Sequence, residues 1–290
     1  MESSIKPQDV PVKTDNHSGV GRRDVGWYFQ TPTLQWPARQ LLEQYSGYSP
    51  SEMVPKVTEF RDRAWETFPF PCLGTFEFLD FVLSTRNRIY PRLLLRLQGG
   101  ATFLDVGCCL GQDIRKLVFD GVPADNVVGA ELRQGYIDLG YELFRDRETL
   151  ASEMYQANVL DDLTTEPWPK LQGRFDVVNF SFVLHCFSRD EQVVMFERGI
   201  KALKDGTLGT TILGLASGAH EATVSMWHGK GVYIHNPETF RRLIEEMEEK
   251  TSTKWRVEVE LDNYINGEDP KYHWIGPKMR RLAWEMTRVA

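Results

Sequence analysis

The segment Phe103–Asp113, FLDVGCCLGQD, contains the residue types of a loop that lets a ligand approach the backbone closely. Asp105 ends a short apolar run, and Gly107 and Gly111 provide positions without a side chain. Cys109 stands in the middle, where loops of this kind often carry a further glycine. Its thiol is small, so we expect the turn to form with a negative φ at this residue, and we interpret the paired cysteines as fillers of a tight turn.

The charges around this loop indicate which kind of ligand it binds. Its glycines follow the pattern G-x-x-x-G, whereas loops that hold a pyrophosphate at a helix N-terminus follow G-x-G-x-x-G. Asp105 and Asp113 flank the glycines, and their carboxylates would repel a diphosphate. They suit a ligand with a cationic end, and S-adenosylmethionine carries an ammonium and a sulfonium. We therefore predict that the loop binds S-adenosylmethionine.

Polar residues at the ends of the following apolar runs favour the same ligand. Glu131 ends the run NVVGAEL, 20 residues after Gly111, where a carboxylate can accept hydrogen bonds from both ribose hydroxyls. Asn158 would face the adenine, and residues 179–180 the methionyl part. Taken singly, each is more often a turn-former or a cap, but their order and spacing together favour a cofactor site. The predicted cofactor-binding residues are Asp105, Gly107, Cys109, Gly111, Gln112, Asp113, Ala130, Glu131, Leu132, Asn158, Val159, Asn179 and Phe180.

Histidines and aromatic residues after the later runs are candidates for contact with a methyl acceptor. His185 follows the run RFDVVNFSFVL and would orient the acceptor or act as a base. A histidine that bonds only to the backbone is an equally good interpretation. The segment MWHGKGVYIHNP is expected to form a loop on the ligand side of a sheet, and packing alone would also explain it. Its candidates for acceptor contact are Trp227, His228, Tyr233 and His235.

An aromatic stretch near the N-terminus offers further acceptor contacts. The segment VGWYFQTPTLQWP is interrupted by proline and is a poor helix former. Trp27 and Tyr28, together with Phe29 and Trp36, would cover a bulky apolar acceptor as a lid. The alternative is a strap that lies on the core, and this is the commoner role for any single aromatic residue of the stretch.

The elements that must position these residues begin with a helical region. Residues 1–24 are polar and aperiodic, which predicts a flexible tail. Helices are expected over residues 37–44, 49–68 and 76–97. The second begins at SPSE, which has the pattern of a capping box with proline at the first helical position. Pro91 is expected to kink or divide the third.

From residue 101 onward, short apolar strands alternate with helices, which predicts a parallel sheet with helices on both faces. A capping box, SRDE, opens the helix after the fourth strand. The last segment, RRLAWEMTRV, places three apolar residues on one face and is expected to be a strand, although a helix would tolerate it. Strands are expected over residues 102–107, 126–132, 154–160, 174–184, 207–216, 254–264 and 280–289, with a helix over 236–250.

The composition of the 290-residue chain excludes several classes of partner. Its net charge of −7 gives no positive field for a phosphate backbone, so no nucleic-acid partner is expected. The four cysteines lack the CxxC spacing of a zinc site, and no metal is expected. Because the first residues contain no apolar segment, we expect no secretory signal, and no apolar run is long enough to span a bilayer. We expect a cytoplasmic protein.

Residues 99–290 resemble the class I methyltransferase superfamily. The resemblance rests on the glycine loop, on Glu131 and Asn158, and on the segment FVLHCFSRDEQVVMFERGIKALKDG. In that segment Leu184-His185-Cys186 corresponds to an LHH-like pair, and LKDGT to an LKPGG-like turn. The resemblance implies an α/β, Rossmann-like fold with a seven-stranded, mostly parallel sheet. It divides the chain into a tail (1–24), a helical and aromatic cap (25–100) and an S-adenosylmethionine-binding methyltransferase domain (101–290).

The helical region, LDVGCCLGQDIRKL and the closing WIGPKMRRLAWEMTR are similar to fungal methyltransferases of meroterpenoid pathways, those related to andrastin, terretonin and austinol biosynthesis. This resemblance implies methyl-ester formation on the carboxyl group of a farnesylated polyketide. Such an acceptor, an apolar carboxylic acid, is already ionised at neutral pH and requires no general base. It also implies a possible homodimer.

Three other hypotheses are consistent with the sequence. The first is methylation of a phenolic oxygen, a carbon or a nitrogen of another secondary metabolite, for which a base such as His185 would help. The second is a non-catalytic regulator with a methyltransferase fold, which the retained Asp105 and Glu131 disfavour. The third is a metal-dependent transferase, for which the sequence offers no Asp/Asn trio at suggestive spacing.

Overall fold

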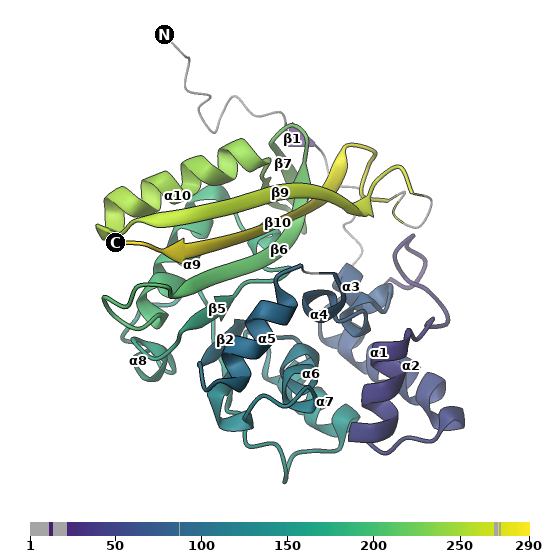
Figure 1. Ribbon diagram of the computed structural model, residues 1–290. Helices are drawn as coiled ribbons and strands as arrows, with labels where there is room; N and C mark the ends of the chain where they lie inside the picture. The colour runs from purple at the N-terminus through teal and green to yellow at the C-terminus, as the bar shows by residue number, and fades with distance from the viewer. Residues whose placement is uncertain (1–11, 14–21, 87, 270–271, 273) are drawn as a thin grey trace. The chain divides into compact units, whose positions relative to one another are not determined.

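Seven strands form the principal sheet of the computed structural model, in the order β4-β3-β2-β5-β6-β10-β9 (Figure 1). The pairs β2–β3, β3–β4 and β5–β6 are parallel, whereas β10 is antiparallel to both β6 and β9. The predicted seven-stranded, mostly parallel sheet is therefore confirmed. Its strands are β2 (Phe103–Val106), β3 (Val127–Glu131), β4 (Met154–Gln156), β5 (Val177–Asn179), β6 (Thr211–Ala219), β9 (Trp255–Asn266) and β10 (Met279–Arg288).

The structure describes residues 12–13, 22–86, 88–269, 272 and 274–290. Contacts divide the chain into two units, which are described separately. Of the described residues, the N-terminal unit comprises those within 22–158 and 165–168, and the C-terminal unit comprises 12–13 and those within 159–164 and 169–290. Most of the predicted tail lies outside the described residues, so its flexibility stays a prediction. Within the described ranges, no helix is long and apolar enough to cross a membrane.

In the N-terminal unit, helices α6 (Gln112–Phe119) and α7 (Gln134–Phe144) pack against β3. Strands β2 and β3 are buried along their whole length, which explains why all their residues except Asp105 and Glu131 are apolar or glycine. Their parallel register pairs Val106 with Ala130, so the two strands end side by side. The loops that follow these strands therefore start next to each other.

The first predicted helices of the N-terminal unit are confirmed. Helix α1 (Trp36–Gln40) continues as the π-helical turn η2 (Leu41–Tyr45), and α2 spans Pro50–Thr67. The expected capping box opens α2: the Ser49 amide and hydroxyl both donate to the Glu52 carboxylate. Helix α2 packs against α7, so the helical region and the strand region of this unit share a core.

The prediction of one helix over residues 76–97 is wrong, although the division expected at Pro91 is confirmed, since a separate helix starts at Tyr90. Between residues 71 and 98, the described part of the chain forms four short helices, because Phe76 and Phe81 adopt positive φ values of 62° and 47° that no continuous helix allows. Both phenylalanine rings are buried, which offsets the strain of the left-handed backbone. Pro91 lies in the first turn of the last helix, where proline is favoured. The helices are α3 (Pro71–Gly74), η3 (Glu77–Leu79), α4 (Val82–Arg86) and α5 (Tyr90–Gln98).

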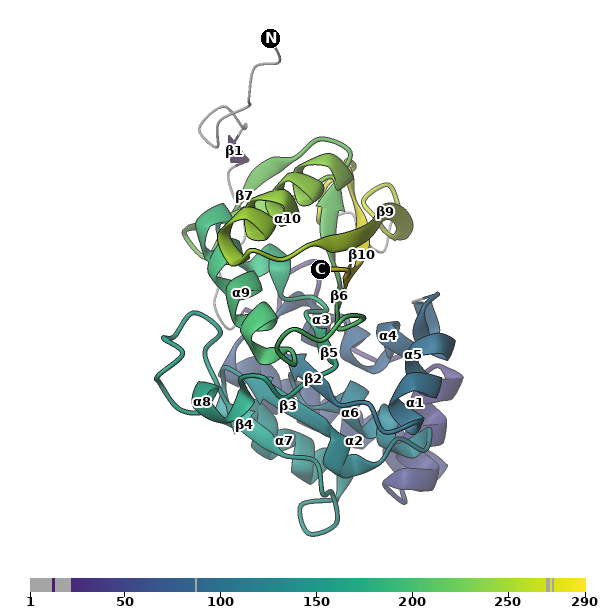
Figure 2. The ribbon, with the colours of Figure 1, turned by 60° about the vertical axis from the view of Figure 1, so that its left-hand side comes forward.

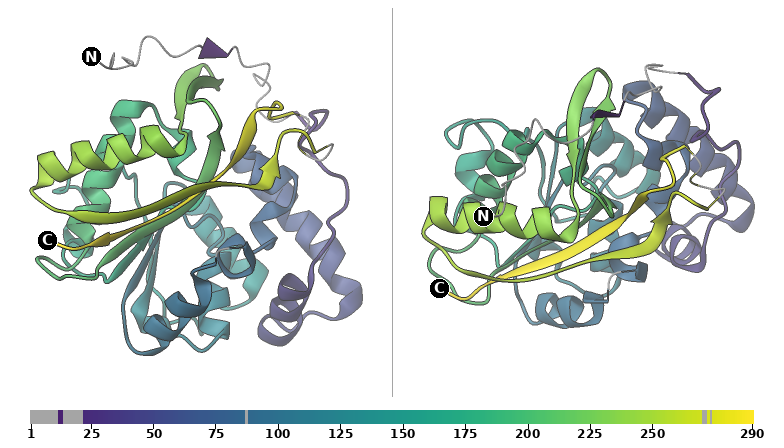
Figure 3. Two further views of the ribbon diagram at one scale, coloured as in Figure 1. Left: turned by 45° about the horizontal axis from the view of Figure 1, so that its top comes forward. Right: turned by 90° about the horizontal axis from the view of Figure 1, so that it is seen from above.

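In the C-terminal unit, α10 (Pro237–Thr251) packs against α9 (Arg189–Ala202) and β9 (Figure 2). Figure 3 shows β9 and β10 as a long antiparallel pair. The expected final strand is confirmed, since Leu282, Trp284 and Met286 are all buried. Gly214 of β6 makes room for this face, because a Cβ there would lie 2.2 Å from the Trp284 ring.

The segment expected as a loop after the fifth strand is instead a β-hairpin. Strands β7 (Thr223–Trp227) and β8 (Lys230–Ile234) pair antiparallel and are joined by His228 and Gly229. Both turn residues have positive φ, 48° and 77°, as two-residue hairpin turns require. The hairpin forms a second sheet, β1-β7-β8, in which β1 (Val12–Lys13) is parallel to β7.

Candidate functional site

The loop from β2 to α6 is held against the end of β3 by backbone hydrogen bonds. The amides of Gly107 and Cys108 both donate to the Ala130 carbonyl oxygen, at 2.7 and 3.2 Å. The Gly111 amide closes a turn onto the Cys108 carbonyl at 2.7 Å. Gly107 and Gly111 have φ values of 78° and 66°, so both glycines occupy positions that favour the residue without a side chain.

The expected negative φ of Cys109 is wrong: its φ is +54°. The left-handed backbone directs the Cys109 amide to the Glu131 carboxylate, whose Oε2 accepts it at 3.0 Å. This charge-assisted hydrogen bond compensates for a conformation that costs a non-glycine residue about 1–2 kcal/mol. Burial raises the pKa of both Cys108 and Cys109 well above the usual range, so both are neutral thiols at neutral pH. They fill the turn, as predicted.

Glu131 lies at the end of β3 and its carboxylate is held by two backbone amides. Besides the Cys109 amide on Oε2, the Arg133 amide donates to Oε1 at 3.0 Å. The side chain is buried, and burial raises the pKa of Glu131 above its ordinary value. A carboxylate offers about four acceptor positions, so each oxygen keeps capacity for one more donor. Two adjacent hydroxyls, such as those of a ribose, fit this arrangement.

The start of α6 presents two polar side chains beside the loop. Gln112 is buried, and among the described residues its Oε1 has no hydrogen-bond partner. The Gln112 amide nitrogen is 3.4 Å from the Asp113 carboxylate. Burial raises the pKa of Asp113 to about 6. An unsatisfied acceptor and a desolvated carboxylate are both stabilised by a cationic donor.

The N-terminal unit brings most of the predicted cofactor residues to one place. Asp105 is buried in β2 next to the loop, and Ala130 supplies the carbonyl that the loop binds. Leu132 follows Glu131 and is about half exposed. Asn158 lies two residues after the end of β4, and its carbonyl accepts the Trp168 indole N–H at 2.8 Å.

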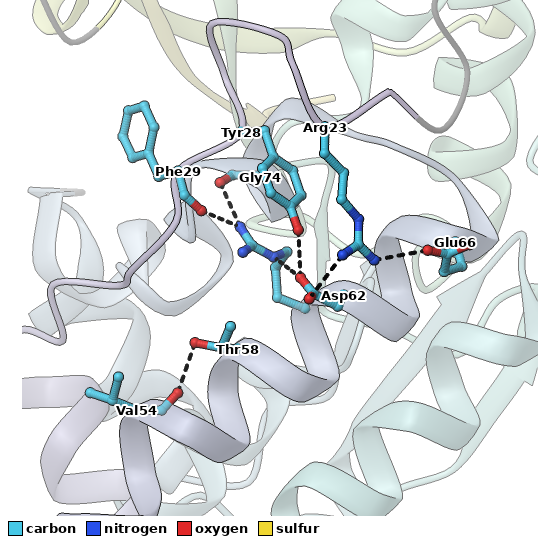
Figure 4. A network of polar contacts seen from close by, with 9 residues as sticks. Arg23, Tyr28, Phe29, Val54, Thr58, Asp62, Glu66 and Gly74 are labelled. Atoms are coloured by element: carbon cyan, nitrogen blue, oxygen red, sulfur yellow. Dashed lines mark hydrogen bonds and ion pairs between the residues drawn. The ribbon is translucent and has the colours of Figure 1, made fainter.

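Figure 4 shows that the aromatic stretch near the N-terminus lies on α2. The Tyr28 hydroxyl donates to Asp62 at 2.8 Å. Arg61, which is buried, lies 4.1 Å from the centroids of both the Tyr28 and Phe76 rings. Its Nη1 donates to the carbonyl oxygens of Phe29 and Gly74, at 2.8 and 3.0 Å.

The same contacts decide how Trp27 and Tyr28 are best interpreted. Both side chains are buried, at 7% and 8% exposure. A Cβ on Gly74 would lie 2.2 Å from the Trp27 carbonyl oxygen, so the stretch runs in direct backbone contact with α3. This geometry favours the strap over the lid, and acceptor contact by these two residues stays a prediction.

In the C-terminal unit, the predicted cofactor residues at the end of β5, and Val159, have different surroundings. Asn179 is buried, and its Oδ1 accepts the Ser181 hydroxyl at 2.7 Å. The Phe180 ring packs in the core against Phe196, and a Cβ on Gly199 would lie 2.7 Å from it. Phe180 can therefore meet a ligand through its backbone and not through its ring. Val159 is buried as well.

His185 lies in the short helix η5 (Leu184–Cys186), and one hydrogen bond fixes its tautomer. Its Nδ1 accepts the backbone N–H of Ser217 at 3.3 Å. Burial lowers the pKa of His185 to about 4, so the ring is neutral at neutral pH. A neutral imidazole whose Nδ1 accepts must carry its proton on Nε2. The Nε2 atom of His185 is therefore a hydrogen-bond donor and not a base.

The candidates on the hairpin divide between half-buried and fully buried residues. Trp227 and His228 make an edge-on ring contact at 4.6 Å beside the turn. Tyr233 is buried against the His235 ring at 4.8 Å. His235 is a core residue: its ring nitrogens bond to Gln192 at 2.7 Å and to Thr239 at 3.0 Å.

Gln192, on α9, is a positioning residue that sequence reasoning missed. Its amide nitrogen donates to the carbonyl oxygens of Leu184 and Phe187, at 3.0 and 3.3 Å, and to that of Tyr233 at 2.9 Å. These bonds hold the backbone on both sides of His185. The only sequence signal was a glutamine on the apolar face of an amphipathic helix. Within the described part of the chain, no group of three His, Cys, Asp or Glu residues is placed to hold a metal ion.

Comparison with known proteins gives consistent matches. A family model described as the N-terminal domain of meroterpenoid methyltransferases matches residues 27–79. The O-methyltransferase phiE of a fungal species is 38% identical over 259 residues, which are 87% of this chain and 85% of that protein. The asnovolin E/chermesin D methyltransferase nvfJ of Aspergillus novofumigatus is 38% identical over 175 residues, 60% of this chain and 62% of that protein.

Among solved structures, phospholethanolamine N-methyltransferase 2 of Haemonchus contortus, in complex with phosphomonomethylethanolamine and S-adenosylhomocysteine, is similar with a TM-score of 0.50. The match covers 79% of this chain and 59% of that chain at 15% identity, so it supports the fold alone. The sequence relatives identify the chain as an S-adenosylmethionine-dependent methyltransferase that belongs to the family of fungal meroterpenoid methyltransferases.

Proposed function

We propose that this methyltransferase forms a methyl ester on the carboxyl group of an apolar, farnesylated polyketide acid. The family match over residues 27–79 supports the meroterpenoid class of acceptor. One relative is named as an O-methyltransferase, which agrees with transfer to oxygen. The geometry of His185 supports a carboxylate rather than another oxygen group as the methyl acceptor.

The proposed cofactor site is the loop between β2 and α6 together with the end of β3. Glu131, fixed by the Cys109 and Arg133 amides, would bind the ribose hydroxyls with the remaining capacity of its two oxygens. Gln112 and Asp113 would bind the ammonium of the methionyl part. When bound, S-adenosylmethionine supplies a methyl group on a positively charged sulfur, which leaves as a neutral thioether.

The observation that carries the proposal is the hydrogen bond from the Ser217 amide to His185 Nδ1. It occupies the nitrogen that could take a proton and leaves Nε2 as a donor. A phenol, with a pKa near 10, gains from a base, whereas a carboxylate is ionised without one. His185 would therefore orient a carboxylate through Nε2–H, one oxygen accepting the hydrogen bond while the other attacks the methyl carbon.

A product assay tests this proposal. We expect purified protein with S-adenosylmethionine to convert apolar prenylated carboxylic acids into products heavier by one CH2 unit that mild alkali cleaves back to the acid. Matched phenols of equal size, and the corresponding carboxamides, should give no product. The pH profile of kcat/KM for the acceptor, measured at saturating S-adenosylmethionine so that Asp113 does not contribute, should show no histidine-like step between about pH 6 and 8, because the pKa of His185 is about 4. His185→Gln, which keeps a donor, should retain more activity than His185→Ala. Alkali-stable products from the phenols alone would contradict the proposal.

A further inference from the structure

A fully buried ion pair lies directly beneath the proposed cofactor loop. Arg115, on α6, donates from Nε and Nη2 to the two carboxylate oxygens of Asp146, at 2.7 and 2.9 Å. Its Nη1 donates to the carbonyl oxygens of Leu110 and Gly111, at 2.8 and 3.2 Å. One guanidinium thus binds a carboxylate on one side and the last two loop residues on the other.

The loop fits closely around this guanidinium. A Cβ on Gly140 of α7 would lie 2.2 Å from the Leu110 carbonyl oxygen, and a Cβ on Gly111 would lie 2.6 Å from Arg115 Nη1. The loop backbone therefore has little freedom to move without moving Arg115. At its other side, the same loop is held by Glu131 through the Cys109 amide. Arg115 and Glu131 together determine where the loop amides point.

The ion pair has a third member in the N-terminal helical region. The Tyr45 hydroxyl, in η2, donates to Asp146 Oδ2 at 2.8 Å. Tyr45 belongs to the segment, residues 27–79, that the meroterpenoid family model matches. A buried ion pair is stable only when its remaining acceptor positions are satisfied, and this hydroxyl satisfies one of them. The helical region therefore contacts the loop through a defined set of hydrogen bonds.

We propose that Tyr45, Asp146 and Arg115 form a positioning chain through which the N-terminal helices fix the cofactor loop in its binding geometry. The inference rests on the proposed cofactor site and adds a role for the N-terminal domain in cofactor affinity, beyond covering an acceptor. Without the Tyr45 hydroxyl, Asp146 and then Arg115 are less restrained, and the loop carbonyls lose a fixed partner. Binding must then order the loop, and affinity falls accordingly.

Tyr45→Phe tests the chain with the smallest possible change. We expect the dissociation constant for S-adenosylhomocysteine, measured by calorimetry, to rise about fivefold. In kinetics, the KM for S-adenosylmethionine should rise in proportion while kcat at saturating cofactor stays within about twofold of the unchanged chain. A merely structural role would lower the melting temperature without this selective effect on cofactor binding.

Tyr90→Phe is the matched control. The Tyr90 hydroxyl donates to Asp120 at 2.6 Å, and Asp120 pairs with Lys116 of the same helix, at the end of α6 remote from the loop. This variant should lose similar stability and keep normal affinity for S-adenosylhomocysteine. Equal affinity of the Tyr45→Phe variant and the unchanged chain, or an equal loss in both variants, would overturn the inference alone. If the unchanged chain does not bind S-adenosylhomocysteine, the proposed cofactor site fails and the inference with it.

Discussion

At the scale of single residues, the proposed site holds a carboxylate where burial opposes its charge. Asp113 has its pKa raised to about 6 by burial, against the opposing effects of the Gln112 hydrogen bond and the Lys116 charge. Neither partner restores the ordinary value. A bound cation would lower the pKa of Asp113 again. Burial of this carboxylate therefore destabilises the free protein, whereas its charge stabilises the complex with a cationic ligand.

Asp113→Asn should therefore stabilise the free protein and weaken cofactor binding. The folded pKa of Asp113 lies above its ordinary value of 3.8, so the folded state binds more protons than the unfolded state between about pH 4 and 6. Stability then falls as pH rises through this interval and stays lower above it. We expect the substitution to raise the free energy of unfolding by about 1–3 kcal/mol at pH 7, with a gain that shrinks toward pH 4.

Melting curves at several pH values, with calorimetry of S-adenosylmethionine binding at pH 7, measure both effects. Glu142→Gln is the control for loss of a charge, because Glu142 is a half-exposed carboxylate of α7 paired with Arg63. It should change neither quantity. An Asp113→Asn variant that melts lower than the unchanged chain at pH 7 would contradict the burial argument.

At the scale of elements, the aromatic strap is fixed to α2 by Arg61, Asp62 and the Tyr28 ring. We expect Tyr28→Phe to lower the free energy of unfolding by about 1 kcal/mol, because it removes one hydrogen bond and keeps the ring. Tyr28→Ala should cost about 3–5 kcal/mol, because it also empties the space above the buried guanidinium. Urea unfolding measures both. A lid contact would instead leave stability unchanged and raise the KM of the acceptor.

The elements that the sequence predicted are those with local signals. The capping boxes at Ser49 and Ser188 mark the starts of α2 and α9 because the cap is formed by residues three apart. The helix over residues 76–97 was wrong because Phe76 and Phe81 are held in left-handed backbone by burial of their rings, which depends on distant parts of the fold. The hairpin was missed because its turn places His228, a residue other than glycine, at a positive φ of 48°.

The residues of the candidate site also divide into those that local spacing selects and those that only tertiary packing places. Gly107, Gly111 and Glu131 could be selected from spacing, since a strand, a tight turn and a strand end place them without reference to other elements. Arg115 and Gln192 could not, because each binds carbonyl groups of segments that only tertiary packing brings near. Spacing in the sequence thus selects candidate cofactor contacts, whereas the residues that hold those candidates in place follow only from tertiary packing.

At the scale of the whole molecule, a ligand that binds only the folded state must stabilise it against unfolding. We expect S-adenosylhomocysteine, at about one hundred times its dissociation constant, to raise the free energy of unfolding by about 2.7 kcal/mol. For 290 residues unfolding together, this corresponds to a melting temperature about 4 °C higher. Because the loop and Glu131 belong to the N-terminal unit, a melt with two transitions should show the shift in the transition of that unit.

Glu131→Ala decides whether this stabilisation comes from the proposed site. The variant loses the carboxylate that receives the Cys109 and Arg133 amides, so ribose recognition and loop geometry are removed together. We expect the ligand-induced shift to disappear in differential scanning fluorimetry, whereas Glu142→Gln keeps it in full. A full shift in the Glu131→Ala variant would place the cofactor elsewhere, and the assignments of Gln112 and Asp113 would be lost with it, because they rest on the same loop.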